Sequence, residues 1–228
     1  MTDGYFITLE GPDGSGKSTQ ARLLAERLRA AGRHARLTRE PGGTPLGCVM
    51  RAVLLHPEAT LEALAQAGLA PGDMQAEPML PLTEALLLSA DRAQHVARLR
   101  EWLAAGDVVI SDRYADATLA YQGYGRGYDL ATLRALQAMA TGGLAPDLTL
   151  LLDLSVEEGQ RRKRVGHEDG EEINRLDLEQ RDFQERVRAG YLALAATEPQ
   201  RWVTLDARAS MGALAEQVWA AAALQLGL

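Results

Sequence analysis

The stretch GPDGSGKST, from Gly11 to Thr19, decides how this chain folds. It matches the pattern G-x-x-x-x-G-K-[ST], whose fixed positions are Gly11, Gly16, Lys17 and Ser18. The apolar run YFITLE at Tyr5 to Glu10 precedes the stretch, and a helical pattern from Ser18 to Ala31 follows it. A strand, a glycine-rich loop and a helix in this order let backbone N–H groups and the helix N-terminus converge on phosphate oxygens. The sequence therefore predicts a phosphate-binding loop.

The residues of this loop have predicted roles toward a nucleotide. Lys17 is predicted to reach the β and γ phosphates of ATP, and the Ser18 hydroxyl is predicted to bind Mg²⁺. Mg²⁺ fits because it is a hard cation that bridges phosphates and keeps several waters. The predicted ATP-binding residues are Gly11, Pro12, Asp13, Gly14, Ser15, Gly16, Lys17, Ser18 and Thr19. The predicted cofactor is therefore Mg²⁺, with ATP as phosphoryl donor.

Strand and helix patterns alternate along the rest of the chain. Further strands are predicted at residues 34–38, 108–111, 148–154 and 202–206, and helices at 46–55, 82–105, after residue 154, after residue 177 and at the C-terminal end. Strands separated by helices of ten or more residues require right-handed crossovers and a parallel sheet. We expect an α/β fold of the P-loop NTPase class, with a doubly wound five-stranded parallel sheet, helices on both faces and a lid. The run VVIS at 108–111 is uniformly apolar, which predicts a central strand.

Length and composition favour one domain over residues 1–228. Residues 56–81 hold four prolines and are predicted to form a surface insert with at most a short helix near 61–67. The net charge of −7 disfavours nucleic acid as a partner. The single cysteine, Cys48, the absence of a signal-peptide pattern and the absence of a long apolar run lead us to expect a cytoplasmic protein with no membrane span.

Charged side chains follow two of the predicted strands. Asp112 ends the strand VVIS, Arg113 adjoins it, and Arg39 follows the strand at 34–38. Ligands of doubly wound folds bind at the carboxyl ends of the strands, where Asp112 can orient a Mg²⁺-bound water. Each arginine alone is equally well explained as a surface ion pair. Together at two strand ends they favour a second anionic group, because guanidinium groups fork onto phosphates.

Several motifs resemble the signatures of the thymidylate kinase family, of the bacterial type with lid arginines. They are TREPGGT at 38–44, SADRAQHV at 89–96, DRY at 112–114, AYQGYGRG at 120–127, APDLTLLLDL at 145–154, NRLD at 174–177 and GYLALA at 190–195. The resemblance covers nearly the whole chain outside the insert. It implies transfer of the γ-phosphoryl group of ATP to dTMP in dTTP biosynthesis, and a homodimer.

The same resemblance implies roles for acceptor-binding residues. Arg39 and Arg113 would bind the dTMP phosphate, and Asp13 would lie by the 3′-hydroxyl and that phosphate. Tyr121 would crowd out a 2′-hydroxyl, and Gln122 would meet the pyrimidine. The remaining members of the predicted set, Leu88 and Arg92, lie one helical turn apart and would face the thymine.

The sequence departs from the family pattern at several positions. Leu88 stands where a stacking phenylalanine is usual, which costs on the order of 1 kcal/mol of base binding. Ala117 replaces a usual serine and Cys48 a common glutamate. These departures leave open a kinase for another pyrimidine monophosphate and, as a further alternative, a silent nucleotide-binding regulatory module.

A lid is implied at residues 159–177. Some family members carry a catalytic arginine in the phosphate loop, whereas this chain has Gly14 there. The charge would then come from the lid, which holds Arg161, Arg162, Lys163, Arg164 and Arg175. Arg175 matches the family best, and Arg162 and Arg164 are weaker candidates. The predicted catalytic residues are Lys17, Asp112, Arg113 and Arg175, and the predicted metal ligands are Ser18 and Asp112. No general base is needed, because the acceptor phosphate is already an anion.

Overall fold

The computed structural model describes residues 4–168, 175–176 and 179–228. Within them, five parallel strands form one sheet in the order β2-β3-β1-β4-β5. The strands are β1 (Tyr5–Glu10), β2 (Ala35–Arg39), β3 (Val108–Asp112), β4 (Leu148–Asp153) and β5 (Trp202–Asp206). The predicted doubly wound parallel sheet is confirmed. The predicted interior position of the 108–111 strand is confirmed, since β3 lies between β1 and β2, while β1 occupies the middle of the sheet. A uniformly apolar strand indicates cover on both faces, which every interior strand of such a sheet has.

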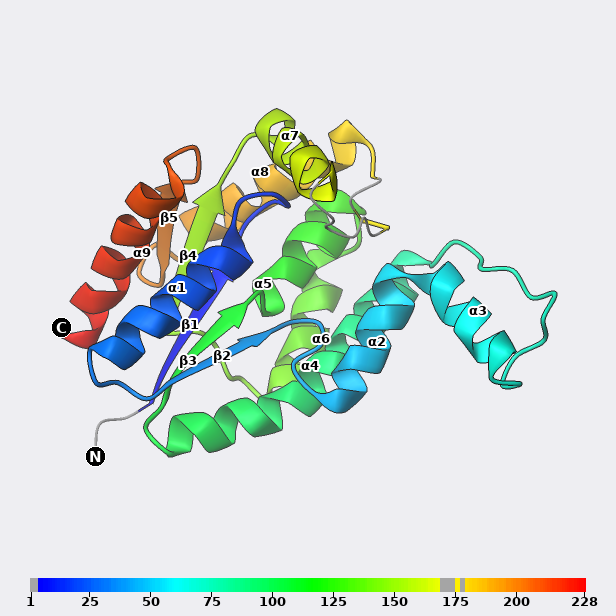
Figure 1. The fold of residues 1–228 in the computed structure, drawn as a ribbon, viewed down its shortest axis with the longest axis horizontal. Coiled ribbons are helices and arrows are strands. Elements are labelled where there is room, and N and C mark those ends of the chain that lie inside the picture. Colours follow the sequence, from blue (N-terminus) through cyan, green and yellow to red (C-terminus); the bar gives the residue numbers. More distant parts are fainter. Residues whose placement is uncertain (1–3, 169–174, 177–178) are drawn as a thin grey trace.

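The helices of the described residues connect these strands, and α9 follows the last strand (Figure 1). They are α1 (Lys17–Ala30), α2 (Pro45–Leu55), α3 (Pro57–Gln66), α4 (Pro81–Ala104), α5 (Ala115–Thr118), the π-helix η1 (Leu119–Gly125), α6 (Leu130–Thr141), α7 (Val156–Glu168), α8 (Arg181–Thr197) and α9 (Met211–Leu226). The α3 helix begins earlier than the predicted residue 61, because Pro57 suits a first helical turn. Figure 1 shows α3 and the loop after it extending away from the sheet. No helix within the described ranges combines the length and the apolar character that crossing a membrane demands.

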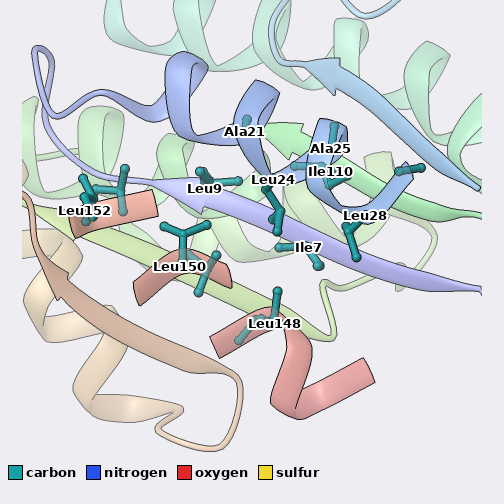
Figure 2. Packing of buried hydrophobic residues seen from close by; sticks show 14 of the residues in the cluster. Ile7, Leu9, Ala21, Leu24, Ala25, Leu28, Ile110, Leu148, Leu150 and Leu152 are labelled. Carbon is teal, nitrogen blue, oxygen red and sulfur yellow. The ribbon is translucent and has the colours of Figure 1, made fainter. Parts of the chain in front are cut away.

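Two layers of helices cover the sheet. On one face, α1 and α9 pack against side chains of β1 and β4, among them Ile7, Leu9 and Leu150, all fully buried (Figure 2). Residues of α4, η1, α6 and α8 form the clusters on the other face. Each fully buried leucine or isoleucine contributes about 1.5–3 kcal/mol of transfer free energy. Side chains alternate along β1, so Phe6 and Glu10 point away from Ile7 and Leu9, toward the α4 and α8 layer.

Candidate active site

Three neighbouring strands end at the same edge of the sheet, and the charged candidate residues lie there. The register pairs Leu9 of β1 with Asp112 of β3, and Asp112 with Arg39 of β2. The phosphate loop follows β1 directly, and Arg113 follows β3 directly. The sheet therefore brings the loop, Asp112, Arg113 and Arg39 to one crevice.

The phosphate loop wraps around the N-terminus of α1. Gly11, Gly14 and Gly16 have φ angles of 139°, 78° and 90°, in a range that favours glycine. The Lys17 ammonium donates to the Pro12 carbonyl at 2.8 Å and to Ser15 Oγ at 3.3 Å. Burial of Lys17, and the nearby charge of Arg113, lower the pKa of its ammonium group to about 8. The lysine is thus held inside the loop, desolvated.

Ser18 and Asp112 form a pair of oxygen donors beside this loop. The Ser18 hydroxyl donates to the Asp112 carboxylate, and both residues line the same cleft as Lys17. In the parts of the chain that the structure describes, no group of three or more His, Cys, Asp or Glu residues could enclose a metal ion. Two hard oxygens at an open phosphate cleft fit Mg²⁺, which fills its other positions with water and phosphate. Two oxygen donors are fewer than the three or four protein ligands that zinc sites use.

Two cavities meet at Arg113. The first, of about 290 Å³, is lined by the phosphate loop, Ser18, Arg39 and Asp112, and we call it the phosphate cleft. The second, of about 110 Å³, is lined by residues of α4, α5 and η1, and we call it the acceptor cavity. Four residues line both cavities: Asp13, Glu40, Arg51 and Arg113. Groups bound in the two cavities would therefore meet at these side chains.

The Arg113 guanidinium is held by four partners. Its Nη1 donates to the Tyr191 hydroxyl at 2.8 Å and to the Gly11 carbonyl at 3.2 Å. Its Nη2 donates to Asp13 at 2.5 Å and to the Tyr121 hydroxyl at 2.9 Å. Burial acts to lower the pKa of Arg113, but the contacts with Tyr121 and Tyr191, and then the opposed charges of Asp13 and Glu10, hold that pKa above its usual value. Arg113 is a fixed cation at the boundary of the two cavities.

The predicted base-contacting residues line the acceptor cavity. Leu88, Arg92, Tyr121 and Gln122 all do so. The Tyr121 hydroxyl donates to Asp13 at 2.8 Å. Gln122 donates its amide to Glu84 at 2.7 Å, while its buried Oε1 has no partner in the described structure. A buried amide oxygen without a partner at a cavity wall suits a ligand N–H donor.

Arg92 lies at the wall of the acceptor cavity, and most of its donors have protein partners. It is fully buried and donates to Glu40, Thr118, Gln137 and the Tyr114 carbonyl. Since a guanidinium has five N–H groups, these contacts leave one for a ligand. Arg92 therefore joins α4 to its neighbours and keeps one N–H group at the cavity, so its contact with a base stays a prediction. Long-range partners of this kind cannot be read from the spacing of a helix.

Arg175, the predicted catalytic arginine of the lid, contacts residues of α2 and α4. Its Nε donates to the Leu54 carbonyl at 3.0 Å and its Nη1 to Glu84 at 3.1 Å, on the side of α2 and α4. It is not among the residues that line the phosphate cleft, whereas Arg162 and Lys163 of α7 are. Of the cations in the predicted lid, Arg162 and Lys163 are therefore the ones that line the phosphate cleft. Arg164 is exposed. Positions 174 and 177 of the NRLD motif lie outside the described residues.

Two glycines let α7 approach the phosphate loop. A Cβ atom on Gly159 would lie 2.6 Å from the Asp13 carbonyl oxygen, and one on Gly14 would lie 2.5 Å from the Gly159 carbonyl oxygen. Real side chains do not tolerate such approaches to backbone. Arg162 and Lys163 follow Gly159 by three and four residues, so they share its helix face. The backbone contact therefore aims these two cations into the cleft.

Arg51 is the functional candidate that sequence reasoning missed. It lines both cavities and donates to the Pro41 carbonyl at 3.1 Å. Burial, and then the nearby charge of Arg39, lower the pKa of Arg51. The sequence does single out this arginine, because Arg51 is the only charged residue of α2, whose sequence is PLGCVMRAVLL. A lone arginine in an apolar helix indicates an ion pair or an anionic ligand.

Comparisons with known proteins point to one family. A family model described as thymidylate kinase matches residues 9–218. The thymidylate kinase of Roseiflexus castenholzii is 49% identical over 223 residues, which cover 93% of this chain and 90% of that protein. The thymidylate kinase of Deinococcus radiodurans is 48% identical, with 97% of each chain covered. The crystal structure of thymidylate kinase from Ehrlichia chaffeensis superposes with a TM-score of 0.70 at 29% identity, covering 96% of this chain and 98% of the other.

Proposed function

This chain belongs to the thymidylate kinase family, and we propose that its two cavities divide the work between the two nucleotides. The enzyme transfers the γ-phosphoryl group of ATP to dTMP, giving dTDP and ADP for nucleotide biosynthesis. ATP phosphates occupy the phosphate cleft in this proposal, and dTMP occupies the acceptor cavity. The observation that carries the assignment is the position of Arg113, which lines both cavities and is the fixed cation between them.

Lys17, Arg113 and the α7 cations neutralise the charge that develops during transfer. The acceptor oxygen is an anion at neutral pH, so no residue has to remove a proton from it. Catalysis reduces to positioning two nucleotides in line and stabilising charge on the transferred group. Arg51, which lines both cavities, and Arg39, which lines the phosphate cleft, add cationic side chains where the acceptor phosphate would meet the ATP phosphates. Arg175 contacts Glu84 and enters this scheme only if the lid moves.

Ser18 and Asp112 would hold Mg²⁺ together with the ATP phosphates. The support is the pair of hard oxygens at the mouth of the cleft. The ion would neutralise phosphate charge when bound. The contribution of the chain itself is to keep the Ser18 hydroxyl and the Asp112 carboxylate in contact at the end of β3.

We further propose that the enzyme is a cytoplasmic homodimer and that residues 1–228 form one domain with an insert at 56–81 and a lid at 159–177. The family likeness supports a dimer, and exposed Leu82 and Leu86 on α4 offer an apolar surface beside α2, where Leu46 and Val49 are also exposed. Apolar surface of this kind is what subunit interfaces bury. Sedimentation of the purified chain would decide between monomer and dimer.

The acceptor is tested by measuring ADP production from Mg²⁺-ATP. The acceptors to compare are dTMP, dUMP, the ribonucleotide of thymine, dCMP and dGMP, with a reaction lacking acceptor as blank. Clear preference for dTMP supports the proposed use of the acceptor cavity. Preference for another monophosphate would overturn the assignment of the base-contacting residues, and turnover without acceptor would overturn the division into two sites.

The lowered pKa of Lys17 predicts a pH effect on ATP binding. The phosphates of ATP favour the charged ammonium, so its pKa rises from about 8 when ATP binds. We expect ATP to bind with proton uptake near pH 8.5, and its affinity to fall as the pH rises through 8. Calorimetry in buffers of different ionisation enthalpy measures the uptake. Equal proton uptake by a Lys17→Met variant would contradict the assignment to this residue.

Leu88→Phe tests the missing aromatic contact in the acceptor cavity. A phenyl ring stacked on thymine should recover on the order of 1 kcal/mol, so we expect the KM for dTMP to fall about fivefold. Leu224→Phe, at an exposed position of α9, is the matched control and should change nothing. A higher KM for dTMP in Leu88→Phe would show that Leu88 is there to leave room for the base.

Gly159→Ala tests the approach of α7 to the phosphate loop. The new methyl group would collide with the Asp13 carbonyl and push Arg162 and Lys163 out of the cleft. We expect kcat/KM for ATP to fall about tenfold, because two cations lose their position, while dTMP binding is kept. Gly212→Ala, on a helix where a Cβ meets no atom within 4 Å, is the control. Unchanged kinetics would mean that α7 does not need this contact.

A further inference from the structure

A buried carboxylate lies behind Arg113 and outside both cavities. Glu10 is the last residue of β1 and is fully buried. Its Oε2 accepts a hydrogen bond from the Tyr191 hydroxyl at 3.0 Å, and that hydroxyl in turn accepts from Arg113 Nη1 at 2.8 Å. Tyr191 comes from α8 and is also fully buried. The three side chains form a continuous chain of hydrogen bonds from the core to the boundary of the two cavities.

Glu10 also holds the backbone next to Arg113. Its Oε1 accepts from the Tyr114 backbone N–H at 2.8 Å. Arg113 has a φ angle of 71° and is the one residue other than glycine with positive φ in the part of the chain that the structure describes. Such a conformation costs roughly 1–2 kcal/mol for a residue with a side chain, so surrounding contacts must maintain it. Glu10 therefore restrains Arg113 both at its backbone and at its guanidinium.

We propose that Glu10 and Tyr191 are positioning residues that fix Arg113 for the acceptor phosphate. Neither is among the residues lining the phosphate cleft or the acceptor cavity, so they act through Arg113 and not on a ligand. An arginine side chain has several rotatable bonds, and holding it in one geometry before the ligand arrives reduces the entropy lost on binding. The inference rests on the proposed function of Arg113.

Two conservative variants isolate the link through Tyr191. Tyr191→Phe removes one hydroxyl and keeps the ring, which packs edge-on against Tyr121 with centroids 6.3 Å apart. Burial raises the pKa of the Glu10 carboxyl to about 8, so the variants are compared at pH 9, where Glu10 is an ionised acceptor. There Glu10→Gln keeps one oxygen to accept the Tyr114 N–H, but its amide group donates and leaves the Tyr191 hydroxyl without an acceptor. Both variants break the same hydrogen bond from opposite ends. Their effects should therefore not multiply.

Calorimetry measures the dissociation constant of dTMP in the absence of ATP. A second titration measures the dissociation constant of ATP in the absence of dTMP. We expect Tyr191→Phe and Glu10→Gln each to weaken dTMP binding about tenfold and the double variant to weaken it by the same factor. ATP binding should stay within about twofold of the wild type, since the ATP phosphates have Lys17 and the loop backbone as well. Tyr128→Phe, a partly buried tyrosine of the same core, is the control.

Three results would overturn the proposal. The first is a dTMP affinity of Tyr191→Phe equal to that of the wild type. The second is a double variant whose dTMP affinity is lowered about a hundredfold. The third is an equal loss of ATP and dTMP affinity, which would indicate general damage to the fold. If Glu10→Gln fails to fold, Tyr191→Phe decides alone. Failure of the proposed function looks different, because the wild-type chain itself would then bind no dTMP.

Discussion

Replacing Lys17 with methionine is expected to lower kcat about a thousandfold while dTMP affinity stays close to that of the wild type. Methionine keeps most of the length and apolar stem of lysine but cannot donate to phosphate. Lys17 is buried in the loop by contacts with Pro12 and Ser15, so its ammonium is already placed where ATP phosphates arrive. A preorganised charge in a desolvated site stabilises the transition state far more than one in water.

The only other lysine of the chain, Lys163, supplies the matched comparison. It lines the phosphate cleft from α7, where Arg162 lies beside it. Because a second cation remains, Lys163→Met should lower kcat only about tenfold. Steady-state ADP production, with calorimetric affinities for each nucleotide, separates the two effects. Equal losses in the two lysine variants would mean that the loop position confers no advantage on Lys17.

Local sequence patterns were sufficient to predict the fold. The phosphate loop is predicted because strand, loop and helix lie within about thirty consecutive residues, and a short motif fixes their relation. The strand ends carrying Arg39 and Asp112 are predicted to meet because parallel strands end at one edge. The π-helix η1 was not predicted, since its AYQGYG sequence has no distinct helical period, and α6 was not included in the predicted order.

Contacts between distant segments account for what the sequence could not predict. Glu10 and Tyr191 are 181 residues apart, and only the packing of α8 on the sheet brings them together. Arg92 looks like a base-contacting residue from its motif, yet Glu40, Thr118 and Gln137 take up most of its donors. The motif containing Arg175 likewise does not reveal that this arginine donates to Glu84 and to the Leu54 carbonyl. Side-chain partners depend on tertiary packing, which a single sequence does not display.

Arg113→Lys is expected to lower kcat/KM for dTMP about a hundredfold, although the charge is conserved. The Arg113 guanidinium uses both Nη groups at once, with Asp13 and Tyr121 on one and Tyr191 and Gly11 on the other. An ammonium group is a single point donor on a shorter reach and cannot hold this arrangement while also binding a phosphate. The loss should fall on dTMP binding and kcat together, with ATP affinity largely kept. Initial rates at varied dTMP concentration and at varied ATP concentration give kcat and the KM for each nucleotide.

The matched control is Arg98→Lys, on the exposed side of α4, where the guanidinium lies over Trp102. It should leave both nucleotide affinities unchanged, because Arg98 lines neither cavity. If Arg113→Lys kept wild-type kinetics, positive charge alone would suffice at this position, and the hydrogen bonds to Tyr121 and Tyr191 would serve stability only. If instead ATP affinity fell as much as dTMP affinity, Arg113 would serve the donor phosphates, and the assignment of dTMP to its face of the acceptor cavity would be wrong.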